Sequence, residues 1–192
     1  MKLYFLRHTS LNIGLDIFYG QTDIDVSSTF KSEVRVIKKK LVDEKVNLQE
    51  IRIFSSPLKR CIKLAKQLKE KYTIDYRLKE MNLGDWEMKE MDSISNEDKL
   101  EWENNLLTYK IPNGESNQEF LARLDDFLND ILKKSEDILI VAHAGSINGM
   151  ISKLTKEPFD KLVKNYWEKI TYGSLSLVEI KEGLVTKRFI GK

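Results

Sequence analysis

The sequence predicts an α/β fold with three layers, in which a mostly parallel central sheet lies between helices on both of its faces. Short apolar runs suited to buried parallel strands occur at residues 2–6, 51–54 and 138–142. Amphipathic helical patterns separate these runs, and strands that alternate with helices are typical of α/β domains. We therefore expect a three-layer α/β/α arrangement.

Three of the expected helices carry terminal signals, at residues 56–68, 116–132 and 146–157. The first begins with Ser56 as N-cap and Pro57 in the first helical position. The second opens on a Ser and Glu pair at capping-box spacing, and the third stops before a proline. Apolar residues at helical spacing follow each start, so each helix has one face for a core.

Weaker patterns complete the expected fold. Residues 73–77 are a further strand candidate, and residues 174–190 alternate around a Lys-Glu-Gly turn, which predicts a closing hairpin. The three lysines at positions 38–40 are interpreted as the solvated face of another helix. No repeat, low-complexity segment or linker interrupts the chain, so its 192 residues are expected to form one domain, 1–192.

The composition is that of a folded globular protein, because 41% of the residues are hydrophobic and 32% are charged. The net charge of only +2 argues against nucleic acid or an anionic membrane as a partner. We expect a small-molecule partner instead, with a homodimer as a possible assembly. A single cysteine excludes an internal disulfide, and no signal peptide or long apolar run is found, so a cytoplasmic location is predicted.

The two histidines of the chain each follow a short apolar strand. His8 comes after the run LYFLR, and His143 comes after ILIVA. In an open α/β sheet, ligands bind at the carboxyl ends of the parallel strands. The two histidines are therefore expected in one site, and Arg7 beside the first of them indicates an anionic ligand.

A phosphate ester fits this site. Arg60 lies near the positive end of the helix predicted after Ser56, and two guanidiniums offer bidentate donors to phosphate. Helix N-termini offer free N–H groups, and Gly145 lets the backbone approach a ligand closely. A neutral imidazole has a lone pair for nucleophilic attack on phosphorus. Glu80 is the best candidate by position for a proton donor to the leaving group.

Other chemistries fit less well. A histidine alone is more often structural than catalytic. The position of both histidines at strand exits is what favours a catalytic role for them. Zinc is not expected, because the chain has no clustered His or Cys ligands. The stretch GSING at residues 145–149 resembles a nucleophile elbow but lacks two of the required glycines. Cys61 falls on an apolar helix face, which favours buried packing over nucleophilic work.

Four motifs in sequence order resemble those of the histidine phosphatase superfamily, also called the phosphoglycerate-mutase-like family. They are RHT at residues 7–9, SSPLKR at 55–60, PNGES at 112–116 and VAHAG at 141–145. RHT alone is unspecific, whereas the ordered set is specific and covers most of the chain. The resemblance implies a phosphoglycerate-mutase-like fold.

The resemblance also implies roles for individual residues. His8 is then the phosphorylated nucleophile, Arg7, Arg60 and His143 form the phosphate pocket, and Glu80 is the proton donor. Neither a metal nor another cofactor is implied.

Within the superfamily, the stretch LKEMNLGDWEM is similar to the α-ribazole phosphatases, which act in cobalamin nucleotide-loop assembly. The stretch YGQTDIDV is similar to the same branch, which implies that Gly20 and Gln21 lie near the substrate. The VAHAG motif implies the same for Ala144. The common motif RHGxTxxN has Asn where Gly14 stands in this chain. Asn12 is the candidate for replacing that asparagine.

The favoured function is therefore a metal-independent phosphomonoesterase that acts through a phosphohistidine, with α-ribazole 5′-phosphate as substrate. One alternative is a phosphatase or mutase acting on sugar phosphates or phosphoglycerate. A second is a binder of phosphorylated ligands without catalytic activity. The joint presence of His8 and Glu80 argues against the binder, because binding alone needs neither a nucleophile nor an acid.

Overall fold

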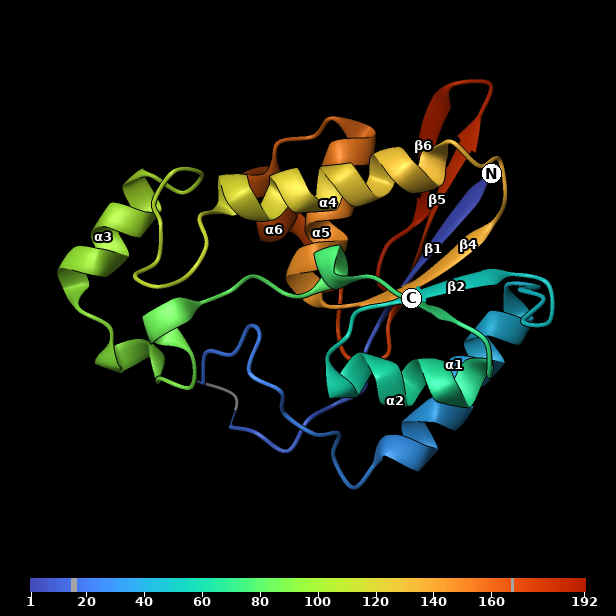
Figure 1. Cartoon of the computed structure of the whole chain (residues 1–192), viewed down its shortest axis with the longest axis horizontal. Helices are drawn as coiled ribbons and strands as arrows, with labels where there is room; N and C mark the ends of the chain where they lie inside the picture. The colour runs from blue at the N-terminus through green and yellow to red at the C-terminus, as the bar shows by residue number, and fades with distance from the viewer. Residues whose placement is uncertain (15–16, 167) are drawn as a thin grey trace.

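A computed structural model describes residues 1–14, 17–166 and 168–192 (Figure 1). Within these ranges, six strands form one sheet in the order β3-β2-β4-β1-β5-β6. The strands are β1 (Lys2–Arg7), β2 (Arg52–Ser55), β3 (Thr73–Ile74), β4 (Ile138–Ala142), β5 (Leu175–Lys181) and β6 (Leu184–Phe189). The helices are α1 (Phe30–Asp43), α2 (Lys59–Leu68), α3 (Asn96–Asn104), α4 (Asn117–Leu132), α5 (Ala144–Thr155) and α6 (Phe159–Tyr166). Three 3₁₀ turns, η1 (Tyr76–Leu78), η2 (Gly84–Trp86) and η3 (Met91–Ser93), lie between β3 and α3.

The sheet is mostly parallel, as predicted. Strands β3, β2, β4 and β1 run in the same direction, while β5 and β6 are antiparallel to their neighbours. In the register of the central strands, Arg7 pairs with Ala142 and Ser55 pairs with Val141. Strands β1, β2 and β4 therefore finish at the same edge, which brings the residues that follow them together.

Helices cover both faces of the sheet, which confirms the three-layer prediction (Figure 1). Leu3 and Phe5 of β1 face a core shared with α4 and α5, whereas Tyr4 and Leu6 face a core shared with α1 and α2. This alternation follows from the two-residue period of a strand. Both faces are apolar because both are covered, and the strands therefore read as continuous hydrophobic runs.

Helix α2 begins later than predicted. Its first residue is Lys59, and Leu58 is the N-cap without a side-chain hydrogen bond, so Ser56 and Pro57 are not the helix start. The N–H of Ser56 instead donates to the carbonyl of Val141 at 3.0 Å, which continues the sheet by one residue. The Ser56 hydroxyl accepts the N–H of Leu58 at 3.4 Å and also makes a contact in the site described below.

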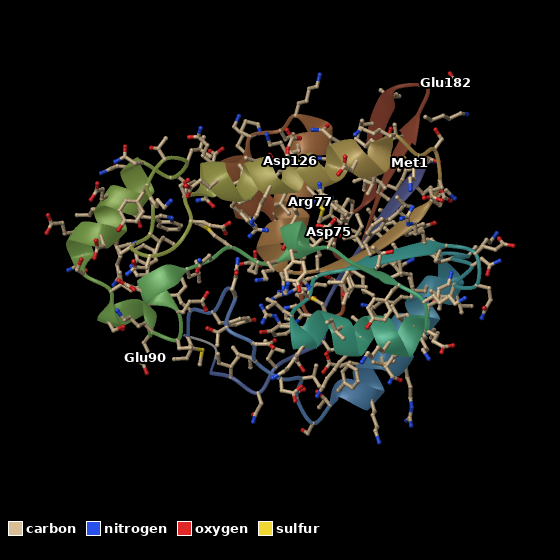
Figure 2. All side chains as sticks on the ribbon, in the orientation of Figure 1. Met1, Asp75, Arg77, Glu90, Asp126 and Glu182 are labelled. Atoms are coloured by element: carbon tan, nitrogen blue, oxygen red, sulfur yellow. The ribbon has the colours of Figure 1, made fainter. Side chains whose placement is uncertain are left out.

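The strand predicted at residues 73–77 is also shorter than expected. It ends at Ile74, because the Asp75 carboxylate accepts the N–H of Arg77 and caps the η1 turn. The side chains of these two residues form an ion pair at 2.7 Å and lie next to each other (Figure 2).

The other local predictions are confirmed. Ser116 and Glu119 form the capping box of α4, and α5 ends before Pro158. Strands β5 and β6 form the closing hairpin, whose turn residues Glu182 and Gly183 both have positive φ, as a type I′ turn requires. No helix in the described part of the chain is long and apolar enough to cross a membrane.

Candidate active site

The two histidines meet at the common edge of the parallel strands. His8 follows β1, His143 follows β4 and is the N-cap of α5, and their ring centroids lie 5.1 Å apart. Each is only 1% exposed, and Arg60, at the start of α2, is fully buried beside them. The site is thus assembled from residues that are more than 80 positions apart in the chain.

One hydrogen bond fixes the protonation pattern of the His8 ring. Nδ1 of His8 lies 2.8 Å from the backbone oxygen of Thr9. Because a carbonyl oxygen can only accept, Nδ1 must carry the proton. In the neutral ring, Nε2 then holds the lone pair, and this is the atom that can attack an electrophile.

His143 has the opposite tautomer. The Nε–H of Arg60 donates to Nδ1 of His143 at 3.2 Å, so Nδ1 is the accepting nitrogen. Nε2 then carries the proton and lies 2.8 Å from the hydroxyl oxygen of Ser56. A neutral His143 in this tautomer presents an N–H, where His8 presents a lone pair.

Both histidine pKa values lie well below 6.5. Burial is the largest cause for each ring, since it penalises the charged form, and the neighbouring Arg60 guanidinium lowers both further. Arg7 adds to the effect at His8. At neutral pH both rings are therefore uncharged, and the net positive charge of the site comes from the two guanidiniums.

The guanidiniums are held by backbone carbonyls. Arg60 donates to the oxygens of Thr22 and Gly20, at 2.8 and 2.5 Å, and Arg7 donates to the oxygen of Ile170 at 2.7 Å. In the described residues, Nε of Arg7 and the hydroxyl of Thr9 are buried without a hydrogen-bond partner. Both groups can donate to an anionic ligand placed between the arginines.

Glu80 lies at the N-terminus of α5. One of its carboxylate oxygens accepts the N–H of Gly145 at 2.8 Å, and the other accepts the N–H of Met81 at 3.0 Å. A Cβ on Gly145 would stand closer than 3.0 Å to a Glu80 oxygen, so only glycine admits the carboxylate here. Glu80 therefore lies at the same helix end that follows His143, and its role as proton donor stays a prediction.

The loop around Gly20 is tied down by Glu87. This carboxylate accepts the N–H groups of Gly20, Gln21 and Thr22 at 3.0, 2.7 and 3.2 Å, and the Thr22 hydroxyl at 2.6 Å. Burial alone would raise the pKa of Glu87, but these hydrogen bonds stabilise the carboxylate and the net shift is downward. Glu87 therefore holds the backbone of the loop at residues 20–22.

Two tyrosines cover the site. The Tyr172 ring lies 4.2 Å from the guanidinium carbon of Arg7, and the Tyr19 ring lies 5.5 Å from that of Arg60. Their hydroxyl oxygens are 2.6 Å apart. Both histidines and Arg60 have almost no exposed surface.

The remaining predicted residues differ in how they relate to this centre. Gly20 and Gln21 lie in the loop that borders Arg60, and the Gln21 side chain donates to the backbone oxygen of Glu80 at 3.0 Å. Ala144 is buried directly after His143. Asn12 makes no hydrogen bond to the catalytic candidates within the described residues, so its substrate contact stays a prediction.

Sequence reasoning missed several residues that shape the site. Ser56 was interpreted as a helix cap, Tyr172 stands in no motif, and Thr22 lies in the stretch YGQTDIDV without having been singled out. Cys61 is buried as predicted, and its thiol lies 3.6 Å from Nε2 of His143. Trp86 is buried and packs against Phe18.

The fold and this set of residues define a phosphatase of the histidine phosphatase class. Residues 3–190 match the sequence profile of the histidine phosphatase superfamily (branch 1), so the chain belongs to this family. A phosphoserine phosphatase candidate of Hydrogenobacter thermophilus is 30% identical over 163 residues, which are 80% of this chain and 78% of that protein. The adenosylcobalamin/α-ribazole phosphatase of Salmonella typhimurium is 24% identical over 212 aligned positions, 99% of this chain and 96% of that protein.

Solved structures share the fold over the whole chain. The α-ribazole phosphatase of Shigella flexneri superposes with a TM-score of 0.84 at 24% identity, over 100% of this chain and 96% of that one. A phosphoserine phosphatase mutant of Entamoeba histolytica, bound to phosphoserine, superposes with a TM-score of 0.82 at 17% identity, over 100% and 96% of the two chains. These likenesses confirm the phosphoglycerate-mutase-like fold.

Proposed function

We propose that this protein is a metal-independent phosphomonoesterase that acts through a phosphohistidine on His8. The observation that carries the proposal is the hydrogen bond from His8 Nδ1 to the Thr9 carbonyl, because it fixes the lone pair on Nε2 of a neutral ring. The two guanidiniums act on the His8 ring, and the centroid of the His143 ring lies 5.1 Å from that of His8, so positive charge and a further ring N–H are available near a phosphoryl dianion.

The reaction is proposed in two steps. In the first, His8 Nε2 forms a bond to phosphorus while the ester P–O bond breaks, and Glu80 in its protonated form gives a proton to the leaving oxygen. In the second, the Glu80 carboxylate takes a proton from water, whose oxygen attacks phosphorus and breaks the P–N bond. Inorganic phosphate leaves, and His8 and Glu80 return to their starting states.

Arg7, Arg60 and His143 are proposed to stabilise the equatorial phosphoryl oxygens in both steps. Nε of Arg7 and the Thr9 hydroxyl support this role, since they are buried donors that have no hydrogen-bond partner among the described residues. Charge-assisted hydrogen bonds from preorganised donors are the main way in which proteins accelerate phosphoryl transfer.

The favoured substrate is α-ribazole 5′-phosphate. The rings of Tyr172 and Tyr19 lie over the guanidiniums of Arg7 and Arg60. Such rings can contact the flat apolar face of a heterocycle. The Salmonella relative named for this activity aligns over nearly the whole chain. Phosphoserine is the second candidate, because the Hydrogenobacter relative has the higher identity of the two.

Rapid quenching during turnover tests the mechanism. Enzyme stopped with alkali should carry phosphate that is stable in alkali and labile in acid, and peptide mapping should place it on His8. The His8→Asn variant is the control and should carry no label. Label on a serine, or phosphate binding without any turnover, would overturn the mechanism.

A comparison of kcat/KM tests the substrate. We expect the value for α-ribazole 5′-phosphate to exceed the values for phosphoserine, 3-phosphoglycerate and fructose 2,6-bisphosphate. A preference for phosphoserine would select the second candidate, and a preference for either of the last two would select the sugar-phosphate or mutase alternative. Each of these results leaves the phosphohistidine step standing.

A further inference from the structure

Arg123, in the middle of α4, belongs to none of the four motifs, yet all five N–H groups of its guanidinium have acceptors. The Nε–H and one Nη2–H donate to the two carboxylate oxygens of Glu115, at 2.7 and 3.0 Å. The other three donate to the backbone oxygens of Arg77, Lys79 and Glu80, at 2.6, 2.8 and 2.8 Å. The side chains of Arg123 and Glu115 are each only 19% exposed.

These contacts converge on the backbone that carries Glu80. Residues 79–83 have no helix or strand of their own, so ladder hydrogen bonds do not fix them. Arg123 holds the Glu80 carbonyl from one side, and the Glu115 carboxylate accepts the N–H of Asn82 at 2.8 Å on the other. The backbone on both sides of Glu80 is therefore held by one ion pair.

The shape of the guanidinium matters for this contact. A planar fork can reach three carbonyls and a carboxylate at once, whereas a lysine ammonium is a compact charge with three donors. The Phe120 ring, 4.8 Å from the guanidinium carbon, packs against Arg123 and restricts its rotamer. Lysine at this position would preserve the charge but lose part of the set of contacts.

We propose that Arg123 and Glu115 form a positioning pair that sets the Glu80 carboxyl for proton transfer to the leaving group. This inference rests on the proposed function, in which Glu80 is the acid. Arg123 touches neither substrate nor the reacting atoms and acts through the backbone of Glu80. Its loss therefore affects the step that needs the proton.

The leaving group separates this role from a general structural one. An alkyl phosphate needs a proton on its departing oxygen, and general-acid catalysis is worth roughly a hundredfold to ten-thousandfold in such steps. The p-nitrophenolate of p-nitrophenyl phosphate leaves without that help. Arg123→Lys should therefore slow the alkyl ester about tenfold or more beyond its effect on p-nitrophenyl phosphate, since a misplaced acid loses part of that factor.

Arg77→Lys is the matched control. Arg77 lies on the same segment, and its side chain pairs with Asp75 and Asp130 without a bond to the Glu80 backbone. It should give equal, small changes on both substrates. Glu115→Gln is a second variant for the pair. Like Arg123→Lys, it should slow the alkyl ester more than p-nitrophenyl phosphate, a difference that we call the leaving-group split. Melting temperatures of all variants report the structural cost separately.

The double variant Arg123→Lys/Glu80→Gln completes the test. If Arg123 acts through Glu80, the substitution at 123 should add no leaving-group split once the carboxyl is gone, because coupled residues are not additive. Equal loss on both substrates in Arg123→Lys, with a split in Glu80→Gln, would overturn the positioning role alone. Equal losses on both substrates in Glu80→Gln itself would overturn the acid role that the proposed function gives to Glu80, while the quench experiment tests the phosphohistidine separately.

Discussion

The hydroxyl of Tyr19 lies 2.6 Å from the hydroxyl of Tyr172, so two residues 153 positions apart close the site together. Each ring also stacks on one of the two arginines, and the histidines behind them are 1% exposed. Since His8 is buried, we expect this pair to separate when a phosphate ester enters and to shield the site from water when it closes again.

Removal of one hydroxyl should make opening easier. Tyr19→Phe keeps the ring on Arg60 but deletes the hydrogen bond, whose net contribution is about 1 kcal/mol. We expect kcat/KM for p-nitrophenyl phosphate to rise by up to about fivefold, which is that free energy expressed as a rate ratio. Steady-state kinetics would measure it. A fall in kcat/KM would instead mean that the hydroxyl contacts the substrate.

Acidification should destabilise the protein in a defined pH window. The pKa values of His8 and His143 are lowered in the folded state, so below pH 6.5 the unfolded chain binds protons that the folded chain does not. The contribution of the two neutral histidines to the free energy of unfolding is then fully present above pH 6.5. It is lost as the pH falls, by about 1.4 kcal/mol per pH unit for each histidine. The half-buried carboxyl of Glu87 also has a lowered pKa, but its effect begins only near pH 4.5.

Urea unfolding between pH 7 and pH 5 would measure this slope. The double variant His8→Asn/His143→Asn is the control and should show a flatter dependence in the same window. Stability that stays constant from pH 7 to pH 5 in the unsubstituted protein would contradict the neutral, buried state of the two rings.

Gly145→Ala should impair catalysis without weakening the fold. A Cβ here would approach the Glu80 carboxylate closer than 3.0 Å, whereas alanine in a helix is favoured over glycine by about 1 kcal/mol. We expect slower turnover of alkyl phosphates, as in Glu80→Gln, at an unchanged or higher melting temperature. Gly149→Ala in the same helix meets leucine side chains instead, so it should lower the melting temperature and spare the leaving-group dependence.

Chelators should leave turnover unchanged. The guanidiniums of Arg7 and Arg60, with His143, supply the positive charge and donors that a metal would otherwise provide. Vanadate should inhibit strongly, because it can become five-coordinate at the nucleophile. Dialysis against EDTA followed by assay would measure the first effect. Activity lost in EDTA and restored by zinc or magnesium would show that the site needs an ion.

Much of the fold could be predicted from the sequence, because local residue patterns determine it. The runs ending at His8 and His143 are apolar on both faces of each strand, which is possible only where helices cover the whole sheet. The capping box at Ser116 and the hairpin turn at Gly183 depend on a few neighbouring residues, so they could be predicted directly. The predicted helix start at Ser56 was wrong because the backbone is still extended at Leu58, while the Ser56 hydroxyl also contacts His143, 87 positions away.

The sequence by itself determined the family, the two strand exits and the candidates Arg7, His8, Arg60, Glu80 and His143, since residue type and order along the chain suffice for these. Only the tertiary structure decided how they act together. The tautomers of the histidines, the tyrosine cover and the hold of Arg123 on Glu80 all depend on hydrogen bonds and ring contacts. Apart from the His8 bond, these contacts join residues far apart in the chain, and such pairings leave no periodic pattern in the sequence.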